Sequence, residues 1–185
     1  MFVDNSLSFN GSWTTPQAIT TTTTSTTVVD ITGAGVGNAP AMINGFPNAN
    51  TSMGEDWGLG DGMALPYVYL TVTTAGTTSN TLTVALNAAP DNGSYSAGSY
   101  TQIYQSKAFT GTALIKGSVL LFQVPPTLFE IGGPTGYSNN QALPRFYQLG
   151  YTCSGALTVS VAAGVIINPP SHMISTLYNS NFQAV

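Results

Sequence analysis

The chain has 185 residues and a formal net charge of −4, and Asp, Glu, Lys and Arg together make up 5% of it, against about 25% in typical domains. Its three strong cations, Lys107, Lys116 and Arg145, cannot form the basic patch that binding to nucleic acid requires. The hydrophobic fraction of 43% excludes a disordered chain, and the shortage of charged residues excludes a coiled coil.

The first predicted strands are residues 17–24 and 26–31. Both are rich in Thr, a β-branched residue that fits a pleated and half-exposed surface. Residues 32–65 then have no hydrophobic period and are rich in Gly, Pro and Asn. We expect a long loop there, of a length that commonly carries function.

The clearest strand pattern is at residues 81–87. Its alternation predicts that Leu82, Val84 and Leu86 face the core, while the residues between them, including Ala85, face outward. The same alternation in the last predicted strand places Leu157, Val159, Val161 and Ala163 inward and Thr158, Ser160 and Ala162 outward. Further strands are predicted at 67–73, 100–105, 113–116, 118–124, 145–153 and 156–167.

Eight or nine short strands, separated by Gly and Pro and without a convincing helix, predict an all-β protein. We expect a single-domain, jelly-roll-like β-sandwich over residues 1–167, because the strand count is near eight. Residues 168–185 form an expected C-terminal tail or arm. Cys153 is the only cysteine, so no disulfide forms within the chain. No signal peptide or apolar run of membrane-spanning length is visible, so we expect a soluble protein made in a reducing cytoplasm.

Residues with catalytic potential are few. His172 is the only histidine, and no Gly-x-Ser-x-Gly motif is present to provide a nucleophile for a triad. One histidine and one cysteine cannot supply the four ligands of a structural zinc site. We therefore expect no enzyme activity, no catalytic residue and no cofactor.

An acidic segment around Trp57 is a weak candidate for Ca²⁺ binding. Glu55, Asp56 and Asp61 provide carboxylate oxygens, but their spacing does not match an EF-hand loop. A glycine-rich turn packed by Trp57 is the favoured interpretation, and no metal is expected. Glu55 and Asp61 as a glycosidase pair is a further alternative, although nothing in the sequence fixes their separation.

Several segments resemble the capsid cement (decoration) proteins of short-tailed bacteriophages. The most specific is LPRFYQLGYT at residues 143–152, followed by GALTV at 155–159. The N-terminal part contributes DNSLSF, QAIT and STTVVDI, and TLTVAL at 81–86 lies between the two groups.

The resemblance implies a jelly-roll sandwich that forms a homo-dimer or homo-trimer and bridges neighbouring major capsid subunits. Such a protein lies on the outer capsid surface of the virion after synthesis in the host bacterial cytoplasm, and it binds neither nucleic acid nor membrane. The expected contact residues are apolar or aromatic side chains of the loops and the tail: Trp57, Tyr137, Met173, Ile174, Leu177, Tyr178 and Phe182. The alternative is a carbohydrate- or receptor-binding β-sandwich module of a phage fibre or spike.

Overall fold

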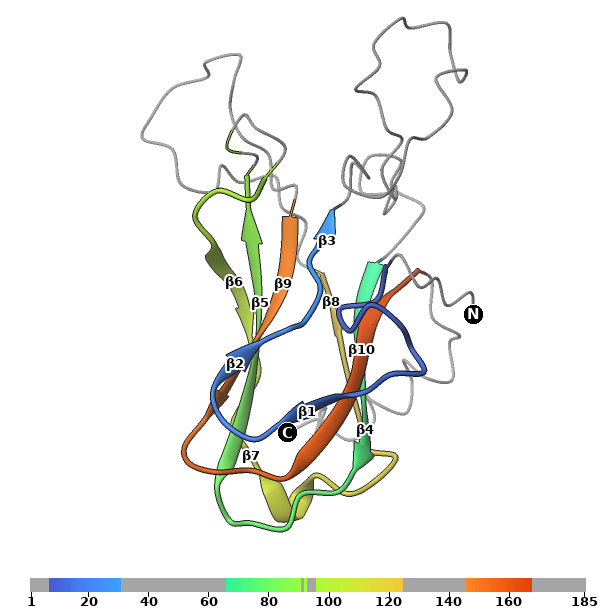
Figure 1. The fold of residues 1–185 in the computed structure, drawn as a ribbon, viewed down its shortest axis with the longest axis vertical. Helices are drawn as coiled ribbons and strands as arrows, with labels where there is room; N and C mark the ends of the chain where they lie inside the picture. Colours follow the sequence, from blue (N-terminus) through green and yellow to red (C-terminus); the bar gives the residue numbers. More distant parts are fainter. Residues whose placement is uncertain (1–6, 31–65, 91, 93–95, 125–145, 168–185) are drawn as a thin grey trace, which may run out of the picture.

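A computed structural model of the chain describes residues 7–30, 66–90, 92, 96–124 and 146–167. The loop expected at residues 32–65 and the tail expected at residues 168–185 lie outside these ranges. The protein is all-β, as the sequence predicts, and its two antiparallel sheets pack as a β-sandwich (Figure 1).

The two sheets are built from strands far apart in the sequence. The four-stranded sheet has the order β1 (Gln17–Ile19), β10 (Val159–Ile167), β4 (Pro66–Thr74) and β8 (Val119–Gln123). The six-stranded sheet has the order β2 (Thr23–Thr24), β9 (Phe146–Cys153), β5 (Thr81–Ala89) and β6 (Thr101–Gln105). In this second sheet β3 (Val29–Asp30) also pairs with β9, and β7 (Phe109–Thr110) also pairs with β5.

The core lies between the inner faces of the sheets and follows the predicted alternation. Leu82, Val84 and Leu86 are at most 1% exposed and belong to one hydrophobic cluster. All four inward residues predicted for the last strand join the same cluster. Ala85 faces outward, between Gly150 and Gln105 in the register, but it is nevertheless buried.

The predicted strand at residues 17–24 is wrong as a single element. The chain crosses from one sheet to the other between β1 and β2, so Ile19 pairs with Val159 whereas Thr23 pairs with Tyr151. The last strand starts at Val159 rather than at residue 156.

The predicted strand at residues 113–116 is also wrong. A short 3₁₀ helix, η2 (Gly111–Ala113), precedes Leu114, whose N–H bonds the Gly111 carbonyl at 3.0 Å. Leu114 is buried in the core cluster, and Gly117 then turns the chain into β8 with a φ of +88°. A left-handed φ favours glycine, so this position ends the irregular segment.

Residues 7–30 close one side of the sandwich. They run from β10 across to β9, and Figure 1 shows this crossing in blue. Ser25 fastens the far end, because its N–H bonds the Leu149 carbonyl at 2.8 Å and its hydroxyl accepts from the Leu149 N–H at 3.1 Å. Near the start, a Cβ on Gly164 would meet the Trp13 ring and lie 2.7 Å from the Leu7 carbonyl oxygen, so glycine allows this segment to lie close.

Candidate protein-binding surface

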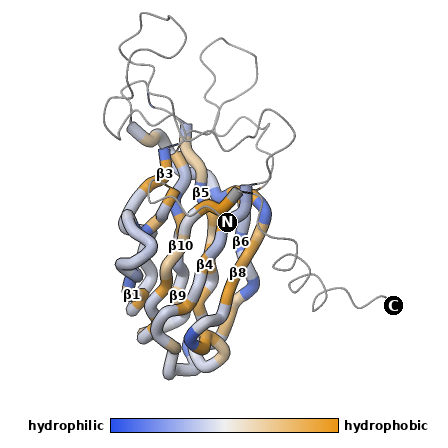
Figure 2. Tube along the Cα trace, turned by 90° about the vertical axis from the view of Figure 1, so that its right-hand side faces the viewer, coloured by the Kyte–Doolittle hydropathy of each residue, from blue (hydrophilic) through white to orange (hydrophobic). Residues whose placement is uncertain are grey.

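The two sides of the sandwich differ in what covers them. One side is crossed by residues 7–30, whereas the opposite side is formed by β6, β7, η2 and β8, which we call the open side. Figure 2, turned by 90°, places β1 and β3 at one edge and β6 and β8 at the other. On the open side the edge strands of the two sheets face each other, and the chain passes from one sheet to the other through η2 and residues 114–118.

One half of this seam is filled by aromatic side chains. The rings of Tyr104 on β6 and Phe122 on β8 stack with centroids 3.8 Å apart and planes 13° apart. Stacked rings bury large apolar areas and prefer defined geometries, so this pair holds the edges of the two sheets together. Burial raises the pKa of Tyr104 and of Tyr100 above the usual value.

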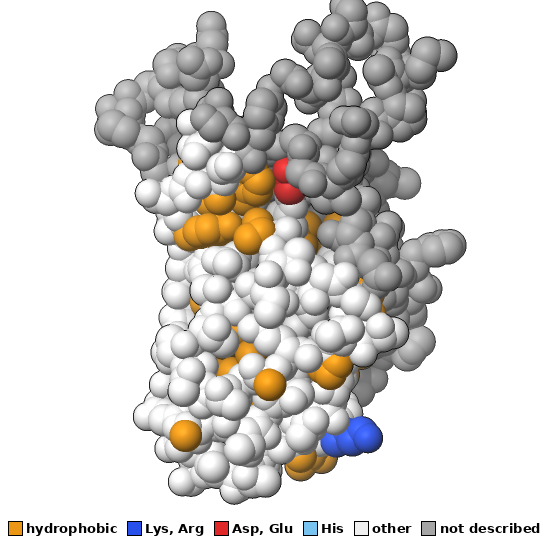
Figure 3. Space-filling view, in the orientation of Figure 1, with side chains coloured by type: hydrophobic (Ala, Val, Ile, Leu, Met, Phe, Trp, Pro, Cys, Tyr) orange, Lys and Arg blue, Asp and Glu red, His pale blue; other side chains and the backbone are white. Residues whose placement is uncertain are grey.

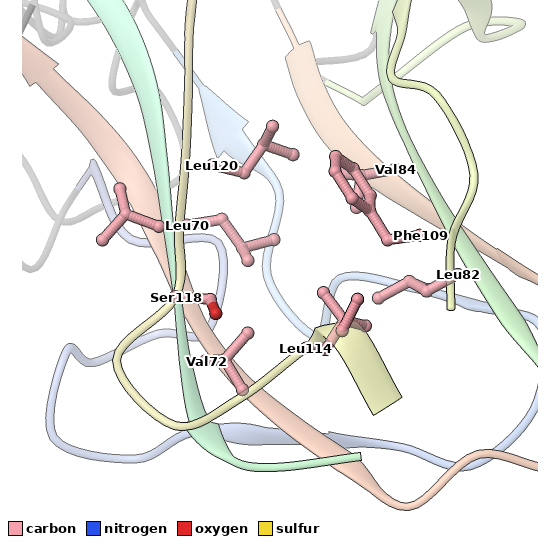
Figure 4. A pocket seen from close by; sticks show the side chains of 10 residues that line it. Leu70, Val72, Leu82, Val84, Phe109, Leu114, Ser118 and Leu120 are labelled. Atoms are coloured by element: carbon pink, nitrogen blue, oxygen red, sulfur yellow. The ribbon is translucent and has the colours of Figure 1, made fainter. Parts of the chain in front are cut away.

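The other half of the seam contains a pocket of about 210 Å³. Figure 4 shows Leu70, Val72 and Leu120 of the four-stranded sheet on one side of it, and Leu82, Val84 and Phe109 of the six-stranded sheet on the other. Ala113, Leu114, Ser118 and Val119 complete the lining. The pocket is therefore lined mainly by apolar side chains, and its lining includes the exposed Val119.

Large hydrophobic side chains are exposed on this side of the molecule. Tyr100, Ile115 and Val119 are 36%, 63% and 37% exposed. Tyr100 directly precedes β6, Ile115 lies in the connection that leads to β8, and Val119 is the first residue of β8. They are the large hydrophobics exposed within the described residues. Of the three, Val119 also lines the pocket, so the open side combines a pocket with exposed apolar side chains.

Charge is sparse throughout the described residues. Within them the charged side chains are Lys107, Lys116 and Asp30. Lys107 lies 5.4 Å from the centroid of the Phe109 ring, a distance that allows a cation–π contact at the rim of the pocket. Figure 3 shows the side crossed by residues 7–30, where most of the described surface belongs to uncharged polar side chains and backbone. Contacts made by the described surface depend on apolar area and hydrogen bonds rather than on ion pairs.

The candidate site residues from the sequence all lie outside the described residues. This applies to the proposed Ca²⁺ ligands Glu55, Asp56 and Asp61 and to the expected contact residues Trp57, Tyr137, Met173, Ile174, Leu177, Tyr178 and Phe182. Those assignments stay predictions. Within the described ranges no three His, Cys, Asp or Glu residues gather in a group suited to a metal ion.

The open side itself was missed in the sequence. The sequence feature that belongs to this side is the apolar run of residues 119–122, preceded by Ile115 and Lys116. Such a run is equally typical of an ordinary core strand. Only the strand order reveals that β8 lies at the edge of its sheet.

Comparisons with known proteins give no identification, since no protein-family model and no curated protein sequence matches the chain. Among the described residues, no helix has the length and apolar character needed to span a membrane.

Proposed function

We propose that this protein is a structural virion protein that binds the outer surface of an assembled phage capsid and bridges neighbouring major capsid subunits. The observation that carries the proposal is the open side, where a nearly uncharged sandwich has a pocket at its seam and exposes Tyr100, Ile115 and Val119. Exposed apolar groups of this kind mark interaction sites on proteins. We name a capsid as the partner because residues 143–159 resemble the capsid cement proteins.

We also propose that the sandwich is a jelly roll, and the strand pairing supports this. With β2 and β3 counted as one strand and β6 and β7 as another, the described residues form eight strands. The first then pairs with the last, the second with the seventh, the third with the sixth and the fourth with the fifth. This nested pairing is the one expected for a jelly roll of two Greek keys.

The stabilising action of such a protein follows from mass action. A protein that binds the assembled lattice and not the separate subunits shifts the equilibrium toward the lattice. Docking of the open side removes apolar side chains from water. Burial of a fully exposed side chain the size of Ile115 contributes about 1.5–3 kcal/mol, and docking gains the share of it that corresponds to the 63% exposure of this residue. The same contact repeats in every copy on the capsid.

The first experiment is cryo-electron microscopy of purified virions. We expect regular copies of the sandwich on the shell, each bridging capsid subunits through the part of the open side around Ile115. Density confined to a tail fibre or spike would contradict the proposal and support a receptor-binding module.

A matched pair of variants tests which surface attaches. Ile115→Asp places a charge on the most exposed apolar residue of the open side and is expected to lower capsid occupancy at least about tenfold, a change of about 1.4 kcal/mol in binding free energy. Thr21→Asp adds the same charge to an exposed residue between β1 and β2, on the side crossed by residues 7–30, and is expected to leave occupancy within about twofold. Equal occupancy for both variants and the wild type would exclude the region around Ile115 as the attachment surface.

A further inference from the structure

β8 is an edge strand without the usual protection against pairing. Natural edge strands carry charged residues, Pro or bulges, or they are very short. The five residues of β8, VLLFQ, contain no charge and no Pro, and the pairing with β4 has no register shift. Among the other described edges, β1, β2 and β3 have three residues or fewer, and β6 has a bulge against β5.

The register shows which backbone groups of β8 point away from the sheet. The Val72 N–H bonds the Ser118 carbonyl, and the Val124 N–H bonds the Pro66 carbonyl, both at 2.9 Å. Hydrogen-bonded positions alternate along an antiparallel pair, so residues 118, 120, 122 and 124 face β4. The N–H and C=O groups of Val119, Leu121 and Gln123 therefore point to the free edge, and no described strand pairs with them there.

We propose that a second copy of this chain adds its own β8 to this edge, antiparallel and about a two-fold axis at Leu121. Leu121 then lies opposite Leu121 of the second copy, and each Val119 lies opposite a Gln123. This register uses all three outward-pointing residues of both strands, so every free N–H and C=O group of β8 gains a partner. An isologous contact of this kind needs only one surface, and it closes at two subunits.

The charges near β8 do not oppose the pairing. Lys116 lies beyond the N-terminal end of β8, so the two Lys116 residues of the dimer lie at opposite ends of the paired strands, where the two Val119 residues are already about 14 Å apart. This distance exceeds the Debye length of about 8 Å at physiological ionic strength. Like-charge repulsion between the two copies at Lys116 is therefore screened.

The side chains of the added strand extend the core. Leu120 and Phe122 face the interior in each copy, and the proposed register places Phe122 of the second copy beside Leu120, at the β8 wall of the pocket. The exposed Val119 gains a neighbour on the outer face. The dimer thus shields part of the open side from water, and this inference depends on the fold alone, not on the proposed function.

Crosslinking of the full chain tests the register. Cys153 is only partly exposed and is first replaced by Ser to remove the natural thiol. Leu121→Cys in this background brings two thiols together across the axis, since facing Cα atoms lie about 5.5 Å apart. Val119→Cys is the matched control, because the two copies of that residue lie about 14 Å apart along the strands. With a short bifunctional thiol reagent, we expect a crosslinked dimer from Leu121→Cys alone. Crosslinking of Val119→Cys, or of neither variant, would overturn this register.

Charge exchange tests the interface independently. Leu121→Lys and Leu121→Glu each place like charges directly opposite, which destabilises a strand pair. Analytical ultracentrifugation should show at least about a tenfold weaker dimer for each variant alone, and recovery when the two are mixed. Gln102→Lys, on the exposed face of β6, is the control and should dimerise as the wild type does. A wild type that stays monomeric at all concentrations, or a dimer lost only in Gln102→Lys, would overturn the proposal.

Discussion

Asn10 gives β10 hydrogen bonds that a neighbouring strand would otherwise supply. Its side-chain carbonyl accepts from the Ala163 N–H at 2.7 Å, and its amide donates to the Val161 carbonyl at 3.4 Å and to Gln17 Oε1 at 3.5 Å. The side chain is buried, so these backbone groups have no access to water as a substitute. At the scale of the residue, the amide side chain of Asn10 therefore provides hydrogen bonds to the part of β10 that extends beyond β1.

Replacement of this side chain should therefore be costly. For Asn10→Ala we expect a loss of about 1–3 kcal/mol in the free energy of unfolding, because the Ala163 N–H is left unpaired in the interior. Urea denaturation followed by circular dichroism measures the change. Thr14→Ala, which removes an exposed hydroxyl bonded only to Ser12 in the same turn, should change stability by less than about 0.5 kcal/mol. Equal effects of the two variants would show that the Asn10 bonds do not stabilise the fold.

Tyr151 gives the protein a pH dependence at alkaline pH. Its hydroxyl is buried without a hydrogen-bond partner among the described residues, and burial raises the pKa of the phenol above its usual value of 10.0. The unfolded chain then releases the phenol proton more readily than the folded chain. The contribution of Tyr151 to stability is therefore fully present below about pH 10 and is lost as the pH rises toward the folded-state pKa.

Tyr151→Phe isolates this effect. At pH 7 we expect the variant to be as stable as the wild type or slightly more stable, because it removes an unsatisfied buried hydroxyl. Above about pH 10 the wild type should lose stability faster than the variant. Urea midpoints measured from pH 7 to pH 11 give the comparison, and parallel curves for the two proteins would disprove this account of Tyr151.

At the scale of the element, sequence patterns predicted a strand well where it pairs on both sides and buries every second side chain. The alternation at Leu82, Val84 and Leu86 belongs to β5, which has a neighbouring strand on each side and one face in the core. The crossing between β1 and β2 was missed because Thr20, Thr21 and Thr22 suit an extended chain in either sheet. The segment around Leu114 was mistaken for a strand because a single buried Leu gives no period.

The same limits explain why the sequence did not reveal the open side. Exposure of Val119 depends on β8 lying at a sheet edge, which arises from pairing between strands distant in the sequence. The apolar run of β8 carries no mark of this position, since a central strand has the same composition. Candidate residues chosen from loops and tail are still predictions, because they lie outside the described residues.

Gly76 couples the turn after β4 to η2. A Cβ at this position would lie 2.6 Å from the Gly111 carbonyl oxygen, and the Gly76 N–H bonds the Leu114 carbonyl at 3.0 Å. Gly76→Ala should force these two segments apart and lower the free energy of unfolding by about 1–3 kcal/mol, as overpacking does elsewhere. Ser79→Ala alters an exposed residue of the same turn and should be nearly neutral. Calorimetric melting of both variants provides the test, and an unchanged melting temperature for Gly76→Ala would mean that the segments separate without cost.

At the scale of the whole molecule, the sandwich combines one side covered by its own chain with one side that is open. Residues 7–30 fasten both sheets through Asn10 and Ser25, whereas the open side relies on the Tyr104–Phe122 stack and leaves a pocket beside it. Charge contributes little to either side, since the described residues carry only Lys107, Lys116 and Asp30. Association through the open side therefore depends on apolar burial and on backbone hydrogen bonds.

This dependence predicts that capsid attachment survives high salt. Exposed ion pairs are screened strongly between about 0.1 and 1 M NaCl, whereas apolar contacts and strand pairing are not. Virions washed across this range should keep the protein at constant stoichiometry, as measured by gel densitometry of sedimented particles. Ile115→Asp virions, washed in parallel, should lose the protein at every salt concentration, since the apolar contact itself is altered. Release of the wild-type protein that grows steadily with NaCl would instead assign the attachment to Lys107, Lys116 or other charged residues of the chain.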